Sequence, residues 1–164
     1  MSDRRATLTT ALKKRLLDTH EQLETLRVAC SQFGDDFDET AFVSAWNSSD
    51  RQVKLSALAV QAAYENSING AIRIAQELAE LAGWTPANAE PTSAEALKAL
   101  RENGVIANAT IHRQLKDAYE QRGSLQHDYA NTIARDIHEQ ARATLDAVPA
   151  LLQDVHLYVV QNLK

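Results

Sequence analysis

Apolar residues recur along the chain at spacings of three, four and seven positions, the pattern of one face of an α-helix. The first stripe predicts a long helix over about residues 6–32, and its apolar members are Leu8, Leu12, Leu16, Leu23, Leu26 and Cys30. Gly34 is expected to end this helix, because glycine readily takes the left-handed conformation found at helix C-termini. Asp38 is then expected to cap a short helix whose large apolar side chains cover one end of a bundle. These side chains are Phe42, Val43 and Trp46.

The next stripe predicts the longest helix, over about residues 50–83. Its inward face is rich in alanine, which lets neighbouring helices approach closely. The inward residues are Val53, Ala57, Val60, Tyr64, Ile68, Ala71, Ile72, Ala75 and Leu78. After a loop over residues 85–92, Thr92 and Glu95 have the spacing of a capping box and predict a short helix through Arg101. Gly104 is expected to end that helix.

Two more helices complete the pattern. One is predicted from about Val105, with Ile106, Ile111, Leu115 and Ala118 on its apolar face. The last begins near Asn131 or Thr132, and Pro149 is expected to kink it. Its stripe is Ile133, Ile137, Ala141, Leu145, Val148, Leu151, Leu152, Val155 and Val159. Together these elements predict an all-α fold, a single domain over residues 1–164 built as an up-and-down bundle of four long helices with two short accessory helices.

Composition agrees with this fold and narrows the function. Five glycines and three prolines are few for 164 residues, which favours helices. The net charge of −5 excludes a global positive field, so any contact with nucleic acid has to be local. The single cysteine, Cys30, predicts a buried thiol in a reducing compartment, and no apolar run is long enough for a signal peptide or a membrane span. We therefore expect a cytoplasmic protein without a membrane association.

The residues with chemical potential gather before the last helix, in the stretch from Arg122 to Tyr129. Arginine can hold a phosphate through two parallel hydrogen bonds, and histidine can transfer a proton near neutral pH. Arg122 and His127 are therefore candidates for cleavage of an RNA phosphodiester, with His127 as base for the 2′-hydroxyl or as acid for the leaving oxygen. Candidates to line the same cleft are Ser124, Gln126 and Asp128.

The spacing sets a geometric condition on this site. Five residues along an α-helix correspond to about 500° of rotation, so Arg122 and His127 would lie roughly 140° apart on one straight helix. Either Gly123 loosens the helix or a second subunit completes the site. Asp128 either orients His127 or is solvated. For Tyr129, one interpretation is that its ring packs at a helix end. The five histidines have no paired cysteine or carboxylate at ligand spacing, so neither a metal nor a cofactor is expected.

An arginine, four residues, a histidine, one residue and a tyrosine form a string that resembles the motif of the HepT-like toxins of the HEPN superfamily. These toxins are the partners of MNT-type nucleotidyltransferase antitoxins. The resemblance extends over nearly the whole chain, through the alanine-rich helix at residues 71–78, the stretch 96–106 and the proline inside the last helix. It implies a homodimer that acts as a metal-independent endoribonuclease at a shared cleft, with Arg122 and His127 as catalytic residues. It also implies that the partner transfers AMP from ATP to Tyr129 and so silences the toxin.

Gly123 departs from the family pattern, which usually has a polar residue, most often asparagine, directly after the arginine. This departure favours a second interpretation, a non-catalytic subunit that binds substrate for a nucleotidyltransferase or regulates it. A third interpretation is a helical scaffold without chemistry. Charge does not decide between them, because acidic side chains balance the basic ones near the motif. The basic ones are Arg113, Lys116, Arg135 and Arg142.

Overall fold

The structure is a computed structural model that describes residues 2–86, 89–124 and 131–163, without the side chains of residues 2, 123–124 and 131–132. The described residues form helices and connecting turns with no strand, so the predicted all-α fold is confirmed. The helices are α1 (Ser2–Ser31), α2 (Glu39–Trp46), α3 (Arg51–Leu81), α4 (Ser93–Glu102), α5 (Ala109–Ser124) and α6 (Asn131–Asn162).

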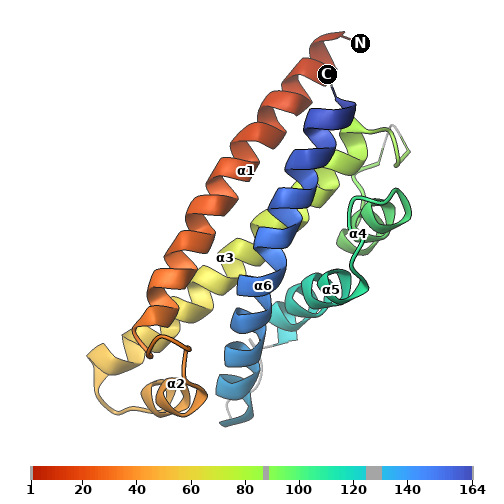
Figure 1. Ribbon diagram of the computed structural model, residues 1–164. Coiled ribbons are helices and arrows are strands. Elements are labelled where there is room, and N and C mark those ends of the chain that lie inside the picture. Colours follow the sequence, from red (N-terminus) through yellow and green to blue (C-terminus); the bar gives the residue numbers. More distant parts are fainter. Residues whose placement is uncertain (1, 87–88, 125–130, 164) are drawn as a thin grey trace.

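Three long helices, α1, α3 and α6, lie side by side along the molecule (Figure 1). The chain runs down α1, up α3 and up α6, and α5 descends between the last two on the side away from α1. The long helices have 30, 31 and 32 residues, whereas α5 has 16. The expectation that α3 is the longest helix was therefore wrong by one residue, because α6 continues through Pro149.

Most helix ends lie where the cap residues predicted them. The side chain of Asp38 accepts a hydrogen bond from the Ala41 amide, and Asp50 caps α3 in the same way. Thr92 and Glu95 form the predicted capping box, with both reciprocal hydrogen bonds present. Asp38, Asp50 and the Thr92–Glu95 pair therefore determine where α2, α3 and α4 begin.

The start of α5 differs from the prediction. The helix begins at Ala109 rather than near Val105, because Gly104 takes a φ of 74° and redirects the chain. Val105 and Ile106 are buried in the connecting segment, where both amides donate to the carbonyl of Leu100. A buried loop and the first turn of a helix have the same apolar pattern in the sequence, so periodicity could not separate them.

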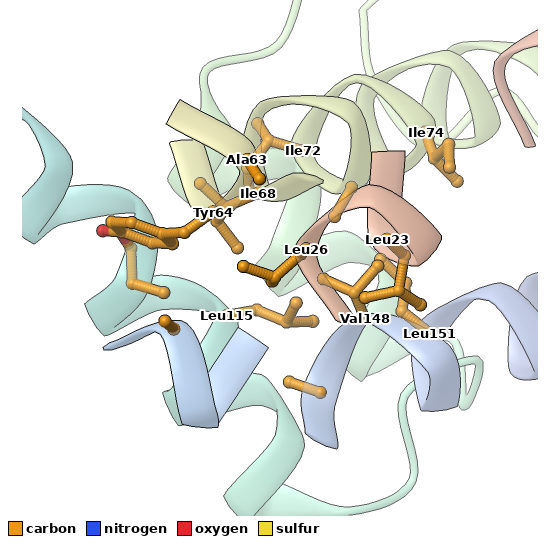
Figure 2. Packing of buried hydrophobic residues seen from close by; sticks show 14 of the residues in the cluster. Leu23, Leu26, Ala63, Tyr64, Ile68, Ile72, Ile74, Leu115, Val148 and Leu151 are labelled. Atoms are coloured by element: carbon orange, nitrogen blue, oxygen red, sulfur yellow. The ribbon is translucent and has the colours of Figure 1, made fainter. Parts of the chain in front are cut away.

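The core is continuous and follows the predicted stripes closely. Figure 2 shows its centre, where side chains from α1, α3, α5 and α6 meet. Cys30 is buried as expected, and burial raises the pKa of its thiol to about 12. Val53 is the exception: 42% of it is exposed, because it lies in the first turn of α3, before that helix reaches the core.

Aromatic side chains close the end of the bundle at α2, as the sequence predicted. Phe42 is fully buried and packs edge-on against Phe33 and Phe37. His138 of α6 lies in the same cluster, and its Nε2 is 2.6 Å from the carbonyl oxygen of Phe37. Trp46 packs on Phe42. The packing interpretation of Trp46 is therefore confirmed, and His138 is a structural histidine.

Helices α1 and α3 approach each other closely at Gly70. A Cβ atom at that position would lie 2.4 Å from Thr19 Oγ1 and 3.0 Å from Gln22 Oε1, which is closer than real Cβ contacts allow. Thr19 is fully buried and β-branched, so it has little freedom to move away. Only glycine fits at this crossing.

We expect Gly70→Ala to lower the free energy of unfolding by about 1–3 kcal/mol, because the strain of overpacking exceeds the gain in helix propensity. Urea denaturation followed by circular dichroism measures the change. The double variant Thr19→Ala/Gly70→Ala removes the nearest opposing atoms and leaves only the end of the flexible Gln22 side chain, so it should be at least as stable as Thr19→Ala alone. A Gly70→Ala protein as stable as the parent would contradict the close approach.

Candidate functional site

The candidate site begins with the attachment of α5 to α3. Tyr64 of α3 is fully buried, and its hydroxyl donates a 2.6 Å hydrogen bond to the Ala118 carbonyl of α5. Figure 2 shows Tyr64 reaching away from the core toward α5. Burial raises the pKa of the Tyr64 hydroxyl, Glu65 raises it further and Arg122 opposes the rise. Arg122 is therefore close enough to influence Tyr64, and it lies one turn of α5 beyond the bonded carbonyl.

Arg122 is held against a tyrosine on its own helix. Its Cζ lies 4.1 Å from the centroid of the Tyr119 ring, an arrangement that the i, i+3 spacing on α5 allows. Its Nε is buried and has no hydrogen-bond partner among the described residues. Stacking uses the face of the guanidinium, so its terminal nitrogens stay available to an anion in the hollow that Arg122 lines.

The edge of Arg122 lines a hollow of about 590 Å³ between α3, the segment before α4, and α5. Asn69, Arg73 and Gln76 of α3 supply amide and guanidinium groups to its wall. Glu90 supplies a carboxylate and pairs with Arg73 at 2.5 Å. The lining is strongly polar, so the hollow suits a charged or hydrogen-bonding ligand rather than an apolar one.

Two further hollows, of about 550 and 610 Å³, adjoin this one along α3. All three share Arg73, and we call the three hollows together the α3 groove. Five of the six polar side chains of α3 that line it recur at spacings of three and four, which places these five in one stripe along the helix, with Glu77 beside it. The five are Asn66, Asn69, Arg73, Gln76 and Glu80.

The four arginines that line the α3 groove differ in their partners. Arg4 pairs with Glu80, Arg15 with Glu77, and Arg73 with Glu90. Arg122 has no ion-pair partner within residues 2–86, 89–124 and 131–163. It is thus the cation whose charge the described part of the groove leaves unneutralised.

Most of the other predicted site residues lie outside the described residues. Ser124 is the last residue of α5, and its side chain is not described. The residues that fall outside are Gln126, His127, Asp128 and Tyr129. The convergence of Arg122 and His127 therefore stays a prediction. Among the basic residues near the motif, Lys116 and Arg135 face carboxylates, at 3.9 Å and 3.6 Å.

The sequence analysis missed the contribution of α3 to this site. Asn69, Arg73 and Gln76 interrupt an otherwise alanine- and isoleucine-rich helix at i, i+4 and i+7. That polar stripe marked the one side of α3 that the core does not cover, and it could have been found by reading the polar positions as closely as the apolar ones. Glu90 gave no such signal, because it stands in a loop.

The arrangement of the described side chains also bears on the class of site. The described residues contain no group of three or more histidine, cysteine or acidic side chains placed to hold a metal ion. None of the helices, as far as the structure describes them, combines the length and the apolar character that a membrane span needs.

The chain was also compared with known proteins. No protein-family model, no curated protein and no solved structure matches it. The likeness to HepT-like toxins therefore depends on the motif and the order of elements in the sequence itself.

We expect Tyr64→Phe to lower the free energy of unfolding by about 0.5–1.5 kcal/mol, because it removes the buried hydrogen bond that joins α3 to α5. Thermal denaturation measures the loss. Tyr158→Phe is the matched control, since Tyr158 is half-buried and its hydroxyl makes no hydrogen bond to the described residues. Equal stability of the two variants would show that the Tyr64 hydrogen bond contributes nothing.

Proposed function

We propose that this protein is a metal-independent endoribonuclease toxin that acts as a homodimer in the cytoplasm. Arg122 and His127 are its catalytic residues, and the two copies bring their motifs to a shared cleft. A partner nucleotidyltransferase of the MNT type neutralises the toxin by transferring AMP to Tyr129. The proposal needs no metal ion and no bound cofactor.

The observation that supports this proposal is the state of Arg122. Its guanidinium stacks on Tyr119, its Nε is buried without a partner, and no described carboxylate neutralises it. A surface arginine with a purely structural role usually satisfies its donors with a carboxylate or a carbonyl. An arginine that keeps its charge and donors in a polar hollow is what a phosphate-binding site requires.

The reaction that we propose is an internal transfer followed by departure of the leaving group. The RNA 2′-hydroxyl loses its proton to a base and attacks the adjacent phosphorus, and the P–O5′ bond breaks as the leaving oxygen takes a proton. The products are a 2′,3′-cyclic phosphate and a free 5′-hydroxyl. His127 serves as the base or as the acid, and Arg122 stabilises the negative charge that grows on the phosphoryl oxygens.

A second candidate function follows from Gly123. A polar residue at that position would add a donor or acceptor beside the phosphate, and glycine adds none. This favours a non-catalytic subunit that presents a substrate to a nucleotidyltransferase, or regulates it. The two functions differ in whether expression of the chain alone stops bacterial growth in a manner that depends on Arg122 and His127.

We expect the purified chain to cleave single-stranded RNA in the presence of EDTA, as gel analysis of a labelled RNA would show. Arg122→Ala and His127→Ala should each reduce the rate by about 100-fold or more, because each removes charge stabilisation or proton transfer. Arg113→Ala and His156→Ala are matched controls, since both side chains are exposed. If His127→Ala cuts as fast as the parent with its fold intact, His127 is not catalytic.

We expect AMP on Tyr129 after incubation with ATP and the nucleotidyltransferase encoded beside this chain, detected by mass spectrometry of proteolytic peptides. The adduct places negative charge near Arg122 and should abolish RNA cleavage. Tyr129→Phe should remain unmodified, while Tyr119→Phe, which retains the acceptor, should be modified like the parent. An adduct on another residue, or none, contradicts this role of Tyr129.

A further inference from the structure

Arg73 occupies the centre of the α3 groove. It lines all three hollows, and its side chain is 55% exposed, so a ligand in any part of the groove can reach it. Arg122 lines one of these hollows together with Arg73. Two guanidinium groups from different helices therefore border the same polar space.

Without a ligand, the guanidinium of Arg73 forms an ion pair with a carboxylate of the same chain. Glu90 accepts a hydrogen bond from Arg73 Nη1 at 2.5 Å. The segment that carries Glu90 is anchored next to it, because Gln76 Nε2 donates to the carbonyl of the buried Pro91 at 2.7 Å. Arginine binds carboxylate and phosphate oxygens through the same donors, so the position of the Glu90 carboxylate marks where a phosphate would bind.

This internal ion pair is easily exchanged. The side chain of Glu90 is 69% exposed, and ion pairs between exposed groups contribute little to stability. A backbone phosphodiester carries the same single negative charge as the Glu90 carboxylate and offers two non-bridging oxygens to a guanidinium, so it can replace Glu90 without disturbing the core. The Gln76–Pro91 hydrogen bond keeps the segment in place when Glu90 leaves.

The shape of the groove favours an extended anion over a small one. Hollows of about 550, 590 and 610 Å³ adjoin Arg73, so the groove offers more room than one phosphate needs. Asn66 and Asn69 line it near Arg73. Side-chain amides carry both donors and acceptors, which suits the base edges and hydroxyls of a single-stranded nucleic acid.

We propose that Arg73 binds a backbone phosphate of single-stranded RNA next to the linkage held by Arg122. Glu90 forms an ion pair with Arg73 until the RNA phosphate displaces it. Arg73 is thus a substrate-binding residue, and Glu90 is an internal competitor of the substrate. This inference rests on the proposed function only in that the chain binds RNA. It concerns affinity rather than the chemical step.

The test measures binding without cleavage. A fluorescein-labelled 2′-O-methyl RNA strand keeps every phosphate but has no nucleophilic hydroxyl, so the unaltered protein can be used. Fluorescence anisotropy gives Kd over a series of salt concentrations. Arg73→Gln should raise Kd about tenfold and reduce the slope of log K against log salt by about 0.7, the value for one lost phosphate contact on a single strand.

Glu90→Gln should lower Kd several-fold, because it removes the competitor, and a gain in affinity cannot arise from misfolding. The double variant Arg73→Gln/Glu90→Gln should bind like Arg73→Gln alone, since Glu90 acts only through Arg73. Glu102→Gln is the matched control: it removes the same charge from an exposed ion pair with Lys98 on α4, outside the groove, and should leave Kd unchanged.

The inference is overturned if Glu90→Gln binds no better than Glu102→Gln, or if Arg73→Gln keeps the Kd and salt slope of the parent. RNA cleavage that depends on Arg122 and His127, without these effects on binding, would leave the proposed function standing and remove the inference alone. RNA binding that depends on Arg73 and Glu90, without any cleavage, would support the inference and contradict the proposed ribonuclease activity. Absence of RNA binding by the parent would overturn both.

Discussion

The structure depends on the burial of α3. Each of the other five described helices packs against it, so the core takes up most of its circumference (Figure 1). Alanines and Gly70 make this crowding feasible, because small side chains let the helix axes approach. Beyond its exposed N-terminal turns, α3 leaves a polar stripe uncovered, and the α3 groove lies along it. The same constraint that fixes the fold therefore determines where a ligand can reach the centre of the molecule.

The charges of the groove arginines bear on the proposed binding of RNA by an acidic protein. With a net charge of −5, the protein as a whole repels nucleic acid, so attraction has to come from individual cations at short range. Arg4, Arg15 and Arg73 each form an ion pair with a glutamate, and these pairs neutralise most of the positive charge of the groove. Arg122 is the described groove arginine without such a partner. A binding surface of this kind favours selective, local contact over tight, extended binding.

The sequence predicted the features that depend on local or periodic signals. The caps at Asp38 and Thr92 and the buried stripes of α1, α3 and α6 could be read directly, because cap residues at the start of a helical period are typical of helices. The start of α5 could not, since a buried loop imitates a helical stripe. The contribution of α3 to the site was missed for another reason: Arg73 and Arg122 are far apart in the sequence, and only the packing of α5 on α3 brings them to one hollow.

The attachment of α5 connects this packing to the proposed chemistry. Tyr64 fixes the register of α5 at Ala118, and Arg122 follows one turn later, so the position of the guanidinium relative to Arg73 is set by a buried hydrogen bond rather than by a surface loop. A buried Nε without a partner costs free energy, and the fold retains it although a glutamate pairs with each of the other three groove arginines. In the proposed function an anion reaches Arg122 from the hollow that this residue lines together with Arg73. The buried hydrogen bond of Tyr64 therefore determines where along α3 a phosphate would be held.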